Sequence, residues 1–250
     1  MFVAASSRCF AELPMETAME RLVDLQFSTI ELMIHDQDGH LKPAEVLADL
    51  EGAVQCCRRT HRLSICAISF DTQTDDEKLA VEQFSACCKL AKAMKVVTVT
   101  VRSSELGTPF NAEIERLGEL VKLAWTEGVR VGLLTEGGRM SQDPDTVRVM
   151  CENAKGLGVT LDPSHFIHGP AAGTSFEPLL QSVYHVRLRD SSKEHLQVRV
   201  GQGEVEYGRL VNQLERVKYN RALCVDMLPI EGVEQMPELR KLRLLLESLL

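Results

Sequence analysis

The sequence predicts a single (β/α)8 barrel that spans residues 1–250. Short β-branched runs alternate along the whole chain with longer runs of helical periodicity. The length suits one barrel, and no linker rich in Pro, Ser or Gly divides the chain. Charged side chains stand at the ends of several predicted strands, which is where barrels of this kind carry their active sites.

Eight short apolar runs are the predicted strands. They span 2–5, 29–34, 63–69, 95–101, 130–136, 158–162, 183–189 and 222–227. An open, doubly wound sheet is the alternative arrangement for strands that alternate with helices. No G-x-G-x-x-G or G-x-x-x-x-G-K-[ST] motif follows any of these runs, so the usual nucleotide-binding signatures of the open sheet are missing.

The predicted helices lie between the strands and after the last one. They span 14–25, 42–60, 75–94, 111–128, 143–158, 207–217 and 237–250, with apolar residues recurring every three or four positions. The crossover after the sixth strand is the shortest, because only "FEPLLQS" at 176–182 is available for a helix.

Composition limits the compartment and the partners. No apolar run approaches the roughly 20 residues of a membrane span, and the first residues lack the pattern of a leader, so we expect a cytoplasmic protein without a membrane partner. The net charge of -8 repels phosphate backbones, which disfavours a nucleic acid partner. The eight cysteines include two adjacent pairs inside predicted helices and no C-x-x-C motif, so free thiols are expected.

Acidic residues end three predicted strands in the second half of the chain. Glu136 follows "GLLT", Asp162 follows "VTL" and Asp226 follows "LCV". Side chains alternate along a strand, so each acid shares a face with the residue two positions earlier. If that face is the barrel lumen, the carboxylates meet at one mouth, and a divalent metal or arginine side chains must neutralise them.

The seventh strand, "VYHVRLR", offers such cations. Alternation places His185, Arg187 and Arg189 on one face of this strand. Facing inward, the two arginines would neutralise the carboxylates. Facing outward, they would pair with acidic residues of the helices.

Two loops carry further candidates. His165 lies three residues after Asp162 in "DPSH", a spacing suited to a metal ligand or to acid/base chemistry, and also to a hydrogen-bonded structural histidine. Arg139 follows Gly137 and Gly138, and it could bind an anionic group or face water. The segment "VGQGEVEYGRL" reads either as a turn into the next helix or as a loop over a ligand.

Taken in order, these strand ends resemble the xylose isomerase-like barrel superfamily of sugar phosphate isomerases, epimerases and endonuclease IV-type proteins. The likeness is carried by Glu136, "LDPSH", "HVRLRD", "VGQGEVEYGRLVNQL" and the acid in "ALCVDM". It implies an isomerase or epimerase that acts on a small, polar, carbohydrate-type substrate. The endonuclease branch is less expected, because it uses many histidines and this chain has 7.

The resemblance also implies a single divalent metal, held by a Glu, an Asp, a His and a Glu on the last four strands. Glu136, Asp162 and Asp226 match three of these ligands, although Asp226 is one methylene shorter. Arg187 stands where the His is expected, and a guanidinium has no lone pair for a metal. The site is therefore altered at one ligand.

Three hypotheses follow for the function. In the first, Mn, Mg, Co or Zn is bound by Glu136, Asp162 and Asp226 with His165 as a substitute ligand, and Glu136, Asp226 and His165 are catalytic. In the second, Arg187 replaces the metal by pairing with Glu136 and Asp162. In the third, the barrel has lost catalysis and serves as a binding or structural subunit.

Further residues at strand ends are candidates for the substrate side. The resemblance gives Glu31 this role, and the positive charges of Arg187, Arg189 and Arg139 make them candidates for binding a carbonyl or an anionic group of the substrate. Less specific candidates in the first half of the chain are Ser6, Ser7, His35, Asp71 and Arg102. A homo-oligomer is compatible with this picture.

Overall fold

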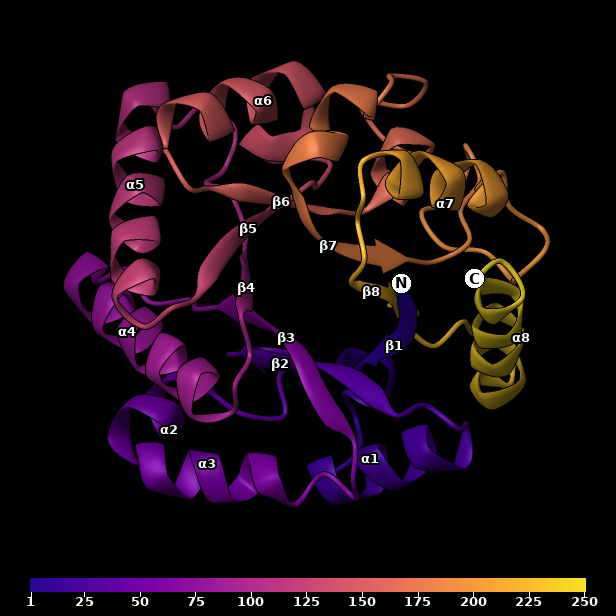
Figure 1. Cartoon of the computed structure of the whole chain (residues 1–250), viewed down its shortest axis with the longest axis horizontal. Coiled ribbons are helices and arrows are strands. Elements are labelled where there is room, and N and C mark those ends of the chain that lie inside the picture. The colour runs from indigo at the N-terminus through magenta and orange to yellow at the C-terminus, as the bar shows by residue number, and fades with distance from the viewer.

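The structure is a computed structural model of residues 1–250, and it contains one closed barrel of eight parallel strands (Figure 1). The strands are β1 (Phe2–Ser6), β2 (Thr29–His35), β3 (Ser64–Asp71), β4 (Thr98–Val101), β5 (Arg130–Leu134), β6 (Gly158–Leu161), β7 (Val183–Leu188) and β8 (Ala222–Val225). Each strand pairs with the next, and β8 pairs with β1 to close the barrel. The predicted fold class is confirmed.

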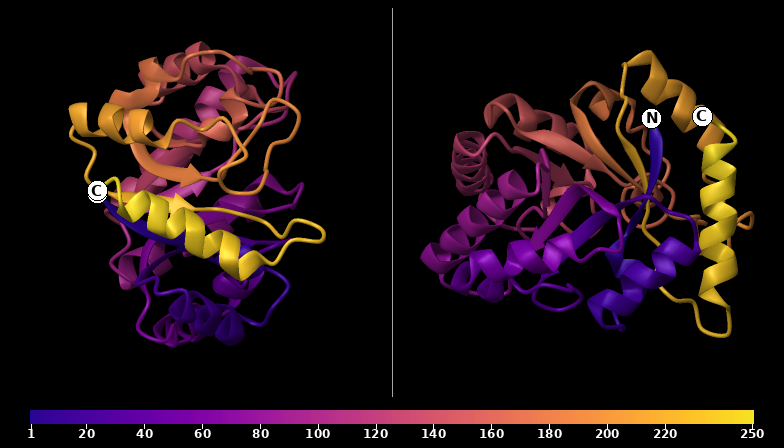
Figure 2. Two further views of the ribbon diagram at one scale, coloured as in Figure 1. Left: turned by 90° about the vertical axis from the view of Figure 1, so that its right-hand side faces the viewer. Right: turned by 60° about the horizontal axis from the view of Figure 1, so that its bottom comes forward.

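Helices form a ring outside the barrel, as the turned views show (Figure 2). They are α1 (Met15–Asp24), α2 (Pro43–Ala48), α3 (Leu50–Arg58), α4 (Glu77–Ala93), α5 (Phe110–Thr126), α6 (Pro144–Asn153), α7 (Tyr207–Arg216) and α8 (Gln235–Glu247). The shorter 3-10 turns are η1 (Ser7–Phe10), η2 (Met140–Gln142), η3 (Pro163–Phe166) and η4 (Glu177–Ser182). No helix is both long enough and apolar enough to cross a membrane.

Two helical segments differ from the sequence prediction. The single helix predicted over 42–60 is interrupted at Asp49, which ends α2 with a non-helical backbone and caps α3 by accepting a hydrogen bond from the Gly52 N–H at 2.8 Å. Asp is a strong N-cap residue, and here it starts a new helix rather than continuing the old one. The sixth crossover has only η3 and η4, in keeping with its short apolar stretch.

The strands separate an apolar outer layer from a polar lumen. On β2, the side chains of Ile30, Leu32 and Ile34 belong to the main hydrophobic core beneath the helices. The alternate residues Glu31 and Met33 contact Arg187 of β7 across the lumen. Burying each large apolar side chain of the outer layer contributes about 1.5–3 kcal/mol, so the stability comes mainly from this layer.

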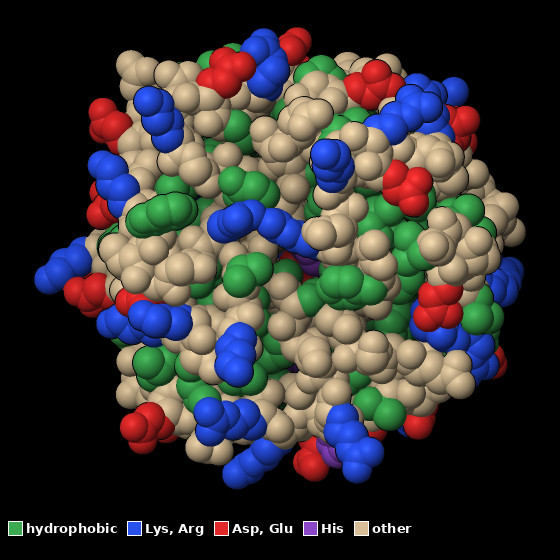
Figure 3. Space-filling model, in the orientation of Figure 1, with side chains coloured by type: hydrophobic (Ala, Val, Ile, Leu, Met, Phe, Trp, Pro, Cys, Tyr) green, Lys and Arg blue, Asp and Glu red, His purple; other side chains and the backbone are tan.

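The molecular surface is charged and mixed. On the face in Figure 3, acidic and basic side chains are interspersed and no large apolar area dominates. All eight cysteines are free, as their spacing predicted.

Candidate functional site

Arginine–carboxylate pairs fill the mouth at the C-terminal ends of the strands. The first joins Arg187 of β7 to Glu31 of β2 through two hydrogen bonds, from Nε to Oε2 at 2.9 Å and from Nη2 to Oε1 at 2.8 Å. Both side chains are buried. Burial alone would raise the pKa of Glu31, but the charges of Arg187 and His185 lower it far below its usual range. Glu31 is therefore a carboxylate fixed by a guanidinium.

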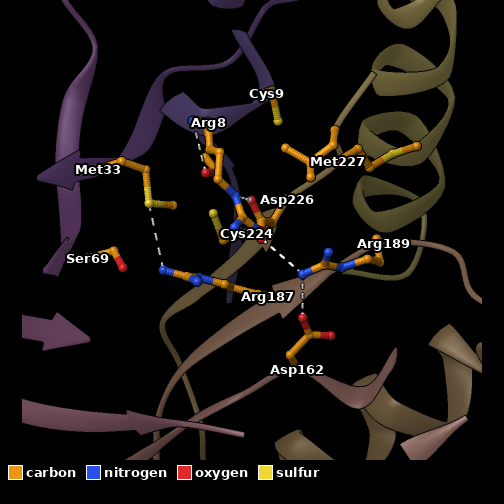
Figure 4. A network of polar contacts seen from close by, with 12 residues as sticks. Arg8, Cys9, Met33, Ser69, Asp162, Arg187, Arg189, Cys224, Asp226 and Met227 are labelled. Atoms are coloured by element: carbon orange, nitrogen blue, oxygen red, sulfur yellow. Dashed lines mark hydrogen bonds and ion pairs between the residues drawn. The ribbon is translucent and has the colours of Figure 1, made fainter. Parts of the chain in front are cut away.

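A second cluster lies around Asp226, as Figure 4 shows. Arg189 Nη2 donates to Asp162 Oδ2 at 2.6 Å and to Asp226 Oδ2 at 3.1 Å, so one nitrogen bridges the two acids. Arg8 binds Asp226 from the opposite side, with Nε 3.2 Å from Oδ1. Burial opposes ionisation of Asp226, but Arg8 and Arg189 outweigh it and lower its pKa.

A third group lies nearer the rim. Arg102, just after β4, binds Glu136 through Nε at 2.8 Å and Nη2 at 2.6 Å, and it binds Asp71 through Nη1 at 3.2 Å. Arg139 Nε lies 3.5 Å from Glu136 Oε2. Burial raises the pKa of Glu136, but the hydrogen bonds and charge of Arg102 lower it overall. Glu136 is thus a weak base.

His165 lies between the second and third groups. Its Nδ1 accepts a hydrogen bond from the Gly137 N–H at 3.1 Å, and its Nε2 lies 3.8 Å from Asp162 Oδ2. Because Nδ1 accepts, the proton of the neutral ring is on Nε2. Burial lowers the pKa of His165, which favours the neutral ring.

The structure decides between two sequence interpretations of strand seven. Arg187 and Arg189 face inward and are buried, so they do not pair with helix acids. The prediction that Arg187 pairs with Glu136 and Asp162 is wrong, because Arg187 pairs with Glu31. Asp162 is bound by Arg189 instead.

One arginine of the mouth was missed. Arg8 lies in η1 after β1, and it contributes to the pairing of Asp226. The alternation of Ala4, Ser6 and Arg8 along β1 and its extension was the available signal.

The residues at the expected ligand positions do not fit a divalent metal. Arg8, Arg187 and Arg189 already balance the three buried carboxylates Glu31, Asp162 and Asp226. A divalent ion would add two uncompensated positive charges to a buried site, and each buried ion without a partner costs several kcal/mol, on the order of 3–5. Binding a metal there requires that a guanidinium moves away.

Another set of possible metal ligands, on β2, β7 and β8, includes Glu31 and fits a metal no better. The ligand atoms of Glu31, His185 and Cys224 lie within 4.8 Å of one another. Both oxygens of Glu31 accept from Arg187, and burial raises the pKa of the Cys224 thiol well above its usual value. A thiol binds metal as the thiolate, which this environment disfavours.

A cleft opens beside the mouth, between α4 and α5. Its volume is about 690 Å³, within the range of small-molecule sites. Asp71, Arg102 and Arg139 line it, so it adjoins the third group, while Glu31, Arg187 and Asp226 are not part of its lining.

A parallel eightfold barrel with charged residues at the C-terminal strand ends defines the class of this protein. The family model described as "Xylose isomerase-like TIM barrel" matches residues 19–243, so the chain belongs to this family. The resemblance drawn from the strand ends is therefore confirmed. No curated protein matches the sequence.

Solved structures share the fold over nearly their whole length. An L-ribulose 3-epimerase is 15% identical with a TM-score of 0.74, covering 100% of this chain and 96% of its own. A xylose isomerase-like barrel protein from Mycobacterium smegmatis, in complex with magnesium, is 13% identical with a TM-score of 0.79, covering 99% and 95%. A 3-keto-D-glucoside 4-epimerase from E. coli is 12% identical with a TM-score of 0.75, covering 99% of each chain. At such identities the likeness establishes the fold.

Proposed function

We propose that this protein binds a small, neutral, carbohydrate-type molecule in the cleft beside the barrel mouth and needs no divalent metal to do so. One observation carries the proposal: each carboxylate that a metal would use is already paired with a guanidinium. Arg102 forms an ion pair with Glu136, and Arg189 forms ion pairs with both Asp162 and Asp226. Fixed arginines supply the positive charge that stabilises the carboxylates.

The chemistry beside the cleft supports a sugar as the ligand. Arg102, Glu136 and Asp71 present donors and acceptors in a small area, and sugar hydroxyls both donate and accept hydrogen bonds. The arginines of the mouth already carry carboxylate partners, so we expect a neutral sugar to bind better than its phosphate ester. Several structural neighbours are named as sugar epimerases, which agrees with this ligand class.

A metal-independent isomerase or epimerase is the second candidate. The imidazole of His165, held by Gly137 near Glu136, favours it, because its Nε2–H can donate a proton to a substrate oxygen. The lowered pKa of Glu136 argues against that carboxylate as a strong base. Binding without turnover is therefore the first candidate, and proton abstraction beside a carbonyl is the second.

The experiment is a binding screen by calorimetry with pentoses, hexoses, ketoses and their phosphates, in the presence of EDTA. We expect at least one neutral sugar to bind saturably. Arg139→Ala should weaken that binding about tenfold, equal to about 1.4 kcal/mol. Arg148→Ala is the matched control, because Arg148 lies on α6 in an exposed pair with Glu152 at 2.7 Å.

Two further results decide between the candidates. Deuterium from heavy water that enters a carbon-bound position of the sugar, with EDTA present, would favour the isomerase or epimerase. A sugar that binds only after Mn²⁺ is added would contradict metal-independent binding.

A further inference from the structure

A hydrogen-bonded chain of three side chains lies at the mouth beside β2 and β3. His35 Nε2 is 2.8 Å from Ser69 Oγ, and His35 Nδ1 is 2.7 Å from Asp38 Oδ1. The carboxylate can only accept while it is ionised, so Nδ1 carries the proton and Nε2 is left to accept the Ser69 hydroxyl. This is the arrangement of a nucleophile, a general base and an orienting acid.

The local sequence fixes this geometry. His35 ends β2 and Ser69 lies on β3, where its register partner is Met33. The following loop turns back over His35 at Gly39, where an added Cβ would lie 2.3 Å from the His35 backbone nitrogen. A glycine is therefore required at this position, and the tight turn brings Asp38 onto the imidazole.

The charges around the chain keep Asp38 ionised. Burial raises its pKa, but the hydrogen bond from His35, the charge that His35 carries when it is protonated and the charge of Arg8 together lower it to about 2. Arg8 Nη1 lies 3.6 Å from Asp38 Oδ2. An ionised orienting carboxylate stabilises the imidazolium that forms when His35 takes a proton.

We propose that Ser69, His35 and Asp38 form a nucleophilic triad that hydrolyses a small carboxylic ester. This activity goes beyond sugar binding and does not depend on it. Ser69 Oγ attacks the acyl carbon while its proton passes to His35 Nε2. The bond to the leaving oxygen breaks, and that oxygen takes the proton. Water then attacks the acyl–Ser69 ester through the same base, which releases the acid and restores the hydroxyl.

Ser69 lies close to the cleft but is not one of its lining residues. Asp71 lines the cleft of about 690 Å³, and Ser69 lies two residues before it on the same face of β3. Two residues of a strand rise about 6.6 Å, so the reacting carbon must reach about that far below Asp71.

A positive charge lies beside Met33, the strand neighbour of Ser69. Arg187 Nη2 is 3.9 Å from the sulfur of Met33, the register partner of Ser69, and Figure 4 shows its guanidinium directed toward this part of the mouth. The two hydrogen bonds to Glu31 use Nε and Nη2, which leaves Nη1 without a protein partner. In the proposed reaction, Nη1 would donate to the oxyanion of the tetrahedral intermediate.

The test is covalent labelling with diisopropyl fluorophosphate, followed by intact mass and peptide mapping. We expect one adduct on Ser69 of the wild type and none in Ser69→Ala. In His35→Gln the labelling rate should fall at least 100-fold, within the usual range for loss of a general base. Ser103→Ala is the matched control, because the equally buried Ser103 hydroxyl contacts Ser141 at 3.0 Å and no imidazole, and it should label as the wild type does.

Hydrolysis of p-nitrophenyl acetate by the same proteins gives a second readout, with a burst of one equivalent expected for the wild type. Asp38→Asn, at a half-buried position, serves if Ser69→Ala does not fold, and its labelling should also slow. A folded wild type that stays unlabelled, an adduct on another residue, or a wild-type rate in His35→Gln would overturn the proposal.

Discussion

Replacing Arg187 with Met tests whether the innermost ion pair carries the energy that its geometry implies. The substitution keeps an unbranched side chain but leaves the fully buried Glu31 without its two hydrogen bonds of 2.9 and 2.8 Å. Removing one partner of a buried pair costs about 3–5 kcal/mol. Glu31 would then keep only His185, whose Nε2 lies 3.3 Å from Glu31 Oε2, near its charge. We expect a loss of that size in the free energy of unfolding.

The double variant Glu31→Gln/Arg187→Met shows how much of the loss in the free energy of unfolding comes from the unpaired charge of Glu31 and how much from the ion pair itself. Replacing both charged groups is often close to neutral, so it should lie within about 1 kcal/mol of the wild type. Urea unfolding of the wild type, both single variants and the double variant measures the coupling. Arg148→Met, on an exposed pair, is the control and should cost at most about 1 kcal/mol. Equal stabilities for Arg187→Met and Arg148→Met would refute the reasoning.

Three more predictions concern acid stability, thiols and one glycine. The pKa of Asp38 is lowered from 3.8 to about 2, so its ionised form stabilises the fold above pH 3.8, and this contribution is lost as the pH falls toward 2. Asp38→Asn should therefore flatten that part of an acid unfolding curve. A curve identical to that of the wild type would contradict this role of Asp38. Burial raises the pKa of Cys57 and of Cys88 to about 12; both thiols should react with a disulfide reagent at neutral pH only after denaturation, and rapid reaction of the native protein would contradict this. Gly203→Ala should destabilise the fold by more than 1 kcal/mol, because its Cβ would lie 2.0 Å from Asp190 Oδ1; a thermal unfolding scan measures the loss, and an unchanged midpoint would count against it.

The strands and the order of the barrel followed from the sequence because the signals are local. Runs such as "VGLL" and "VVTVTV" are apolar and β-branched, and each ends at a charged residue or a turn. Alternation along "VYHVRLR" was enough to place Arg187 and Arg189 on one face. The break at Asp49 was missed, because Asp occurs both on helix surfaces and at N-caps, and only the turn itself decides.

The partners of the arginines did not follow from the sequence. Arg187 reaches across the lumen to Glu31 on a strand 156 residues away, and the height of each residue in the barrel depends on the stagger between strands. A register shift between Val159 and Thr160 changes this stagger near β6 and β7. Patterns of single strands carry no information about such offsets.

The catalytic-type chain of Ser69, His35 and Asp38 also escaped the sequence interpretation. His35 was one of several weak candidates, and Ser69 is an ordinary residue of an apolar strand. Only the pairing of β2 with β3 brings the two together, and only the turn at Gly39 brings Asp38 to the ring. The strand pairing and the turn therefore had to combine before the arrangement became visible.

Metal content is the measurement that tests the central claim, that guanidinium groups stand where a metal would bind. Protein purified without a chelating tag is analysed by elemental mass spectrometry and titrated calorimetrically with Mn²⁺, as wild type, Arg189→Ala and the control Arg148→Ala. The wild type and the control should contain no stoichiometric metal and show no saturable binding, whereas Arg189→Ala should gain a site at Asp162 and Asp226. One equivalent of tightly bound metal in the wild type would contradict the account.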